Sequence, residues 1–218
     1  MLVRTWNLFH GNTYPPQRRA FLREMIELVT QDAPDIVCLQ ELPLWSLPHL
    51  ERWSGMHAAT VVARRSRVES ARLGGWLTAI NHGLLRSALT GEADAILARS
   101  AFRERGSAVV STVGLRRVVH AIRLDDGTVV ANGHTHGEDQ FHRVVDFIGD
   151  EERIVLAGDF NLVPPYDLAG FSEPLPGSID QILVRGLPSG TSFAWPEDRR
   201  RFGDRLLSDH APVELTVG

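Results

Sequence analysis

Short runs of apolar, β-branched residues recur along almost the whole chain, whereas few segments show helical spacing. Strands are expected at 2–9, 35–41, 95–98, 109–113, 118–124, 129–132, 154–156, 182–184 and 213–217. Helical patterns cover 21–30, following Pro15-Pro16, and then 75–90 and 141–148. Many strands and few helices in mixed order favour an α/β structure in which sheets pack face to face with helices outside.

The organisation of the chain indicates one domain. The 218 residues suit a single domain or two very small ones, and neither an internal repeat nor a Gly/Ser-rich linker divides them. Hydrophobic residues make up 43% and charged residues 23%, which excludes a disordered chain. We therefore expect a single domain over residues 1–218.

Several functional classes are excluded by what the sequence lacks. No apolar run approaches the ~18 residues that a membrane span needs, and Arg4 and Asn7 interrupt the early apolar stretch that a signal peptide would require. Cys38 is the single cysteine, so neither an internal disulfide nor a cysteine zinc site is expected. These features predict a cytoplasmic protein.

The basic residues are all arginines. The net charge is −4, so no overall positive field draws the protein to nucleic acid. The 23 basic residues include no lysine, which excludes Schiff-base chemistry and a P-loop. Any phosphate clamp must therefore use arginine, which binds phosphate in bidentate fashion.

Polar side chains stand at or just after the ends of the expected strands, where a side chain is both rigid and open to a cleft. They are Asn7, Glu41, Asn132, His134, Asp159, Asn161, Asp180, Asp209 and His210. Each alone is explained as readily as a cap or turn residue. Together they supply oxygen donors and histidines without thiolates, a set that suits Mg²⁺ or Mn²⁺.

The order of these motifs resembles the endonuclease/exonuclease/phosphatase superfamily, whose members share the deoxyribonuclease I-like fold. The motifs are Thr5-Trp6-Asn7-Leu8, Leu39-Gln40-Glu41, Asn132-Gly133-His134, Gly158-Asp159-Phe160-Asn161, Ser178-Ile179-Asp180-Gln181-Ile182-Leu183 and Ser208-Asp209-His210-Ala211-Pro212-Val213. The resemblance covers residues 2–217. It implies an α/β (α+β) four-layer sandwich of two packed mixed β-sheets flanked by helices.

The resemblance also implies roles for individual residues. Glu41, Asn7 and Asp209 match the metal ligands, and Mg²⁺ or Mn²⁺ is the expected cofactor. Asp159 matches the residue that activates or orients the attacking water, and Asn161 the one that holds that water or a phosphate oxygen. His134 and His210 match the pair that binds the phosphoryl oxygens, and Asp180 matches the carboxylate that orients His210 and favours its protonated form.

The implied function is divalent-metal-dependent hydrolysis of a phosphate ester, most simply by a phosphodiesterase or nuclease. Hydrolysis of a small phosphoester or a lipid headgroup is the alternative. The expected partner is a phosphate-ester substrate, with nucleic acid one choice and no protein partner implied. A non-catalytic module with the same fold is a further alternative, which the intact Glu41, Asp159, Asp180 and His210 disfavour.

Three local features depart from the family pattern or resemble another. His136 follows His134 closely and is expected at the surface, while Glu92 is one candidate for an acid that orients His134. Asn132 either positions His134 or satisfies backbone groups. The segment 133–136 and Gly158-Asp159 also resemble motifs of calcineurin-like metallophosphoesterases, but their DxH and GNH motifs are missing and the two motifs present stand in the reverse order.

Two sets of residues admit a structural and a binding interpretation. The arginines at 64–67, 103, 105, 116–117 and 199–201 either line a groove for phosphates or form a solvated surface, and acids near 199–201 favour the latter there. An apolar stripe of Trp76, Leu77, Ile80, Leu84, Leu85 and Ala88 is expected to pack in the core rather than to touch lipid.

Overall fold

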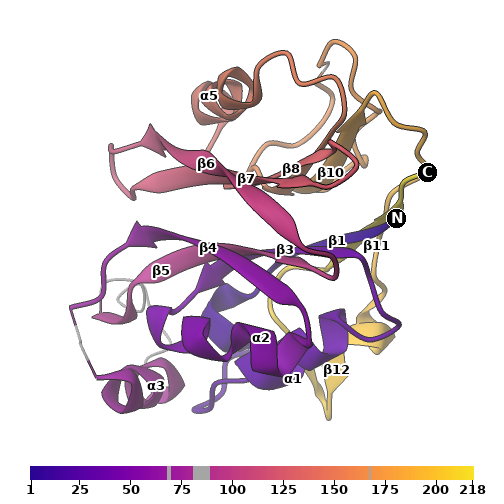
Figure 1. Cartoon of the computed structure of the whole chain (residues 1–218). Coiled ribbons are helices and arrows are strands. Elements are labelled where there is room, and N and C mark those ends of the chain that lie inside the picture. Colours follow the sequence, from indigo (N-terminus) through magenta and orange to yellow (C-terminus); the bar gives the residue numbers. More distant parts are fainter. Residues whose placement is uncertain (68–69, 81–88, 167) are drawn as a thin grey trace.

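Two large β-sheets lie face to face in the computed structural model, which describes residues 1–67, 70–80, 89–166 and 168–218 (Figure 1). The six-stranded sheet has the order β11 (Phe193–Ala194), β14 (Val213–Thr216), β1 (Leu2–Asn7), β3 (Ile36–Leu42), β5 (Glu92–Ala98) and β4 (His57–Arg64). The five-stranded sheet has the order β10 (Asp180–Arg185), β9 (Ile154–Asp159), β8 (Val129–His134), β7 (Arg117–Leu124) and β6 (Phe102–Ser111). A small sheet joins β12 (Arg201–Phe202), β13 (Arg205–Leu207) and β2 (Thr13–Tyr14).

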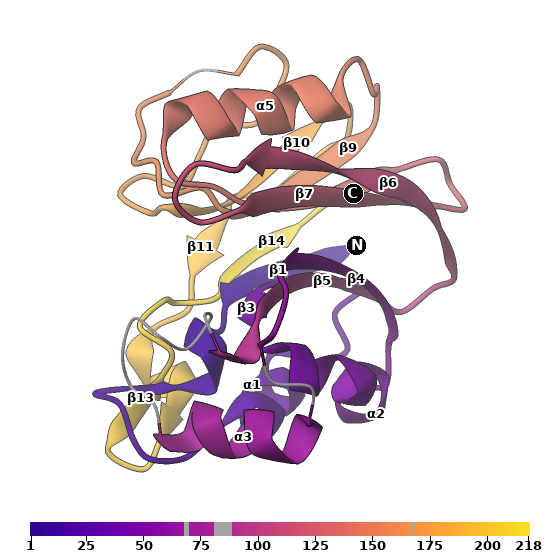
Figure 2. The same ribbon diagram turned by 90° about the vertical axis from the view of Figure 1, so that its left-hand side faces the viewer.

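Helices cover the outer faces of both sheets, which makes four layers (Figures 1 and 2). The helices α1 (Leu22–Val29), α2 (Leu50–Ser54) and α3 (Ala71–Ile80) lie on the six-stranded side, and α5 (Glu138–Ile148) covers the other sheet. Short 3₁₀ segments are η1 (Phe9–Gly11), η2 (Leu44–His49) and η3 (Glu197–Arg200). The expected sandwich of two mixed sheets flanked by helices is confirmed.

Separate apolar cores hold the layers together. One core lies between the sheets and includes Val3, Ile36, Ile96, Val130 and Ile182. Two further cores bury the inner faces of the helices against the sheets. Burial of this apolar surface supplies the main driving force for association of the layers.

Strand pairing brings the polar strand ends to one end of the sandwich. β1 and β3 are parallel, as are β8 and β9, so their carboxyl ends share an edge in each sheet. β10 and β14 run antiparallel to β9 and β1, which places the start of each beside those ends. At Gly158 (φ +152°) an added Cβ would lie 1.9 Å from the carbonyl oxygen of Gly133, so β9 and β8 pair there only with glycine.

Most expected strands are present, with differences at the sheet edges. The hairpin turn at 125–127 joins β7 to β8. The strand expected at 109–113 is β6, which begins at Phe102, and β4 was not predicted at all. Both are edge strands with many exposed positions, so their sequences lack the continuous apolar run of a central strand.

The helix expected at 75–90 is α3, which spans Ala71–Ile80, while residues 81–88 lie outside the described residues. The expectation that its apolar stripe packs in the core is wrong for Trp76 and Ile80, whose exposed fractions are 57% and 40%. The buried positions of α3 are Gly74 and Thr78. Small side chains are needed there because Gly74 packs directly against Trp45, and the Trp45 indole N–H donates to Thr78 Oγ1 at 2.9 Å.

In the described ranges, no helix combines the length and the hydropathy required of a membrane span.

Candidate active site

All of the site residues expected from the sequence lie at one end of the two sheets. Asn7, Glu41, His134 and Asp159 end or nearly end their strands, Asp180 begins β10, and Asn161, Asp209 and His210 lie in adjacent loops. Hydrogen bonds and ion pairs connect Asn7, Glu41, His134, Asp159, Asn161, Asp180 and His210. Residues up to 200 positions apart in the sequence therefore form one site.

Asp159 lies at the centre, and its carboxylate is held by two amide side chains. Asn7 Nδ2 donates to Oδ2 at 2.9 Å, and Asn161 donates to Oδ1 from its backbone N–H at 3.1 Å and from Nδ2 at 3.0 Å. Asn161 Nδ2 also donates to the Thr135 carbonyl oxygen at 3.0 Å. Both amide hydrogens of Asn161 are thereby used, which favours a role in orienting Asp159 over donation to a phosphate oxygen.

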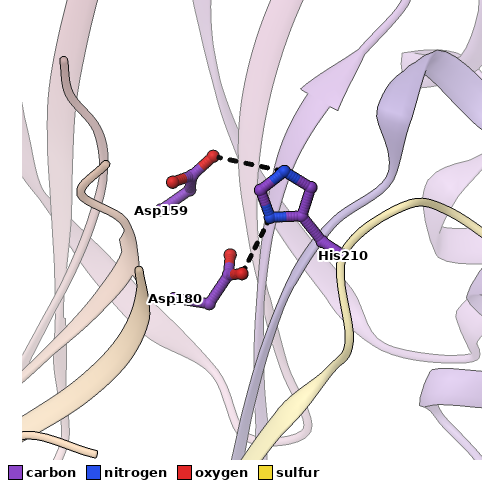
Figure 3. Close-up of side chains that lie close together, drawn as sticks. All are labelled: Asp159, Asp180 and His210. Atoms are coloured by element: carbon purple, nitrogen blue, oxygen red, sulfur yellow. Dashed lines mark hydrogen bonds and ion pairs between the residues drawn. The ribbon is translucent and has the colours of Figure 1, made fainter. Parts of the chain in front are cut away.

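His210 lies between two carboxylates (Figure 3). Its Nδ1 lies 2.8 Å from Asp180 Oδ2, and its Nε2 lies 3.9 Å from Asp159 Oδ2. Burial opposes the charged imidazolium, but the hydrogen bond and the negative charge of Asp180, assisted by Asp159, outweigh it and raise the pKa of His210 to about 9. His210 is thus protonated at neutral pH, with one N–H directed toward Asp159.

The loop that carries His210 is held by buried donors. Arg200 Nη1 donates to the carbonyl oxygens of Ser208 and His210, each at 3.1 Å, and Ser208 Oγ donates to the Asn7 carbonyl oxygen at 2.7 Å. The interpretation of 199–201 as a solvated surface is therefore wrong for Arg200, whose exposed fraction is 7%. It holds for Arg201, which is exposed and pairs with Glu197.

His134 is oriented by an ion pair that the sequence suggested only in part. Arg117 Nη1 donates to His134 Nδ1 at 2.9 Å and forms a buried ion pair with Glu92, whose Oε1 lies 3.5 Å from the same nitrogen. In the neutral imidazole, Nδ1 accepts from the guanidinium and the proton lies on Nε2. Burial opposes the charged form, but the hydrogen bond to Glu92 and the nearby Asp159 and Glu41 carboxylates raise the pKa of His134, and the charged ring also carries an Nε2–H. That N–H faces Asp159 Oδ2 at 3.5 Å. Glu92 was a candidate from the sequence, whereas Arg117 appeared only among the surface arginines.

Asn132 and His136 take no direct part in this arrangement. Asn132 accepts a hydrogen bond from Gln40 Nε2 at 2.7 Å and donates to the carbonyl oxygens of Leu39 and Ala95. It therefore joins the two sheets and satisfies backbone groups, the second of its two expected roles. His136 is exposed, as expected.

Glu41 lies at a bulge in β3 with a left-handed backbone (φ 57°). Its Oε2 lies 3.4 Å from His10 Nε2, and its Oε1 lies 3.9 Å from His134 Nε2. The sequence did not indicate His10, which follows the first strand in the short η1 segment and also has a positive φ of 52°. Nothing local distinguishes this histidine, because its contact with Glu41 depends on the packing of η1 against β3.

The donors around Glu41 fit a hard divalent cation. Glu41 retains solvent access, with 19% of its side chain exposed, and Asp209 lies on the exposed loop before β14. Asn7 Oδ1 accepts one hydrogen bond, from the Phe9 N–H at 2.9 Å, so a second lone pair is available. Ligand atoms of Asp159, Asp180 and His210 also lie within 4.8 Å of one another, but there His210 is hydrogen-bonded to Asp180 and forms an ion pair with Asp159 at 3.9 Å.

Comparisons with known proteins identify the family of the chain. The family model described as Endonuclease/Exonuclease/phosphatase family matches residues 5–210. No curated protein matches the sequence significantly. Among solved structures, an endonuclease/exonuclease/phosphatase from Beutenbergia cavernae is 18% identical to this chain. The match covers 100% of this chain and 72% of that chain, with a TM-score of 0.69.

Two further solved structures share the fold. TDP2 from Caenorhabditis elegans is 16% identical, with 100% of this chain and 74% of that chain covered and a TM-score of 0.67. The 3′–5′ exonuclease NExo from Neisseria meningitidis is 19% identical, with 100% of this chain and 99% of that chain covered and a TM-score of 0.62. Because the family model matches residues 5–210 and the two packed sheets are present, the chain belongs to the endonuclease/exonuclease/phosphatase family and has its deoxyribonuclease I-like fold.

Proposed function

We propose that this protein is a divalent-metal-dependent phosphodiesterase, with nucleic acid as its leading substrate class. The observation that carries the proposal is the position of Asp159 Oδ2, which lies 3.5 Å from His134 Nε2 and 3.9 Å from His210 Nε2. One carboxylate thus faces the N–H groups of two histidines. A phosphoryl group at this point would meet both N–H groups and the carboxylate.

Asp159 is proposed to orient the attacking water and accept its proton. Asn7 and Asn161 hold both carboxylate oxygens, so the carboxylate is oriented before substrate binds. A water held by Asp159 would attack phosphorus in line with the leaving oxygen. The proton would move from that water to a carboxylate oxygen of Asp159.

The two histidines are proposed to bind the phosphoryl oxygens. His210 is charged, because its hydrogen bond to Asp180 and the nearby carboxylates raise its pKa to about 9 against the opposing effect of burial. His134 presents Nε2–H because Arg117 occupies Nδ1. Donors fixed before the reaction stabilise the negative charge that develops on these oxygens in the transition state.

Glu41, Asn7 and Asp209 are proposed to hold the divalent cation. Few protein ligands suit Mg²⁺, which retains several waters and binds through one or two carboxylates together with substrate phosphate. When bound, such a cation neutralises phosphate charge and stabilises the leaving oxygen. Magnesium is the proposed ion and manganese the alternative.

The choice of nucleic acid is supported by NExo, which is described as a 3′–5′ exonuclease in one structure and as a 3′ phosphatase bound to a product DNA hairpin in another. The core site is equally suited to a small or lipid-headgroup phosphodiester, so that class is the second candidate. Intact contacts around Asp159 and His210 disfavour a non-catalytic module.

Hydrolysis of a chromogenic phosphodiester and the matching phosphomonoester, each with Mg²⁺ and with Mn²⁺, tests the proposal. Glu41→Ala is the control for metal-dependent turnover. We expect diester turnover that this substitution removes, followed by cleavage of DNA or RNA oligonucleotides. Turnover of the monoester alone would contradict the proposal and indicate that the protein is a phosphatase. Undiminished turnover by Asp159→Asn would contradict the assigned chemistry.

A further inference from the structure

Helix α3 presents its large apolar side chains to solvent and its small ones to the protein. Leu73, Trp76 and Ile80 have exposed fractions of 46%, 57% and 40%, whereas Gly74 and Thr78 are buried. At 3.6 residues per turn, the three exposed side chains and Arg72 fall within an arc of about 100°, roughly opposite Gly74 and Thr78. This is the reverse of a helix that is apolar on its inner face.

The inward face of α3 is stably packed, so the outward orientation is specified by the structure. Gly74 lies against the Trp45 ring, where an added Cβ would be 3.2 Å from Cδ1. Trp45 donates to Thr78 Oγ1, and Thr78 in turn donates to the Gly74 carbonyl oxygen at 3.0 Å. Rotation of the helix to bury Trp76 would break these contacts.

Arginines are concentrated in the segment that leads into α3 and in its first turn, where Arg72 falls within the exposed arc. Residues 64–72 contain four arginines and one glutamate, although the whole chain has a net charge of −4. Arg65, Arg67 and Arg72 are exposed, and no ion pair to them is found in the part of the chain that the structure describes. Arg65 also borders an open depression of about 500 Å³ beside α3 whose wall includes Trp45 and Ser70.

We propose that the α3 face, defined as Leu73, Trp76, Ile80 and Arg72, binds the surface of an anionic lipid bilayer, with Arg65 and Arg67 of the preceding segment adding positive charge nearby. Exposed Trp, Leu and Ile at helical spacing enter the interfacial region, while arginines contact negatively charged headgroups. The proposal concerns binding of the protein to a membrane surface and does not depend on the proposed phosphodiesterase activity.

Two other occupants fit the face less well. A second copy meeting it about a two-fold axis would bring like-charged arginines together, and three side chains cover far less than the ~800 Å² per partner of a stable interface. Single-stranded nucleic acid would match the arginines and Trp76. However, it gains from stacking on aromatic rings, which Leu73 and Ile80 do not offer.

Vesicle co-sedimentation of the full chain tests the proposal. We expect binding to vesicles of equal parts phosphatidylcholine and phosphatidylglycerol, weak binding to pure phosphatidylcholine, and loss of binding as salt is raised. Substitution of Leu73, Trp76 and Ile80 together by Ser should reduce partitioning about tenfold or more. Arg67→Gln and Arg72→Gln, which leave the apolar residues unchanged, should each reduce partitioning to the vesicles about fivefold.

The matched control is Phe193→Ser, which removes an aromatic side chain of 45% exposure from β11, at the opposite edge of the sheet from β4. It should bind vesicles as the unsubstituted protein does. Every variant should hydrolyse a soluble phosphodiester at the unsubstituted rate, which separates this test from that of the proposed function. Equal binding by the triple-serine variant, or no binding by the unsubstituted protein, would overturn the proposal. Trp76-dependent binding of an oligonucleotide without vesicle binding, or dimerisation abolished by the triple substitution, would replace it.

Discussion

Nδ1 of His210 lies 2.8 Å from Oδ2 of Asp180, and this contact joins the start of β10 to the loop before β14. Asp180 has a second carboxylate oxygen that is buried without a hydrogen-bond partner. Burial raises the pKa of Asp180 to about 6, an effect that the hydrogen bond and charge of His210 partly offset. The pair therefore carries one negative and one positive charge at neutral pH and sets the charge that His210 presents to a substrate.

Removal of the Asp180 charge should change the pH dependence of catalysis. His210 has a pKa of about 9, since Asp180 and the nearby acids outweigh the effect of burial, and its protonated form is the proposed active one. Activity of the unsubstituted enzyme should therefore persist to about pH 9 and fall above it. In Asp180→Asn the fall should begin at lower pH, which a kcat–pH profile measures. An unchanged alkaline limb would show that His210 is not the group that titrates.

Removal of Asp159 or His210 should lower kcat with little change in KM. Asp159→Ala and His210→Ala are each expected to reduce kcat ~10²-fold or more, because both groups act mainly in the transition state. His136→Ala is the matched control, since this histidine follows His134 by two positions but is exposed. Steady-state kinetics on a soluble phosphodiester provide the measurement. A loss confined to KM would contradict the assigned roles.

Removal of divalent metal should abolish turnover, and Glu41 should be the residue that most affects metal affinity. Glu41→Gln keeps the shape of the side chain but removes its charge, so the Mg²⁺ concentration for half-maximal rate should rise at least ~10-fold. Calorimetric titration with Mn²⁺ gives the same comparison without turnover. Full activity after exhaustive chelation would exclude the metal-dependent mechanism.

Arg117 should contribute to both stability and catalysis. Arg117→Gln leaves the buried Glu92 carboxylate without its cation, which should cost about 3–5 kcal/mol in free energy of unfolding. The double variant Arg117→Gln, Glu92→Gln removes both charges and should recover much of that stability. The kcat of the double variant should stay low, because the Arg117 guanidinium no longer contacts His134 Nδ1 or orients the ring. Denaturant unfolding and kinetics on the same samples separate the two effects.

His120 should make the fold sensitive to acid. Burial lowers the pKa of His120 to about 3, below the ~6.5 expected for it in the unfolded chain. The unfolded state therefore binds more protons between these values, so stability is present above about pH 6.5 and falls as pH drops toward 3. His120→Gln removes this proton uptake, and its unfolding free energy should decline less between pH 7 and pH 5. Equal declines measured by denaturant unfolding would assign acid sensitivity to other groups.

The local sequence was sufficient to predict the central strands and the polar residues that stand at their ends. Val129–His134 and Ile154–Asp159 are buried on both faces and read as continuous apolar runs. Edge strands such as His57–Arg64 were missed because alternating exposure breaks that pattern. The contacts assigned to Asp159 and His210 were expected because the order of motifs resembles a known family.

The sequence by itself determined which segments become strands and which oxygen donors and histidines stand at their ends, because both depend on neighbouring residues. Only the tertiary structure decided that Arg117 meets Glu92 and His134, and that His10 meets Glu41. Those contacts join different strands and both sheets, so they depend on how the sheets pack. The outward face of α3 was decided in the same way, because Trp45 packs against Gly74 and donates a hydrogen bond to Thr78, which leaves Trp76 in solvent.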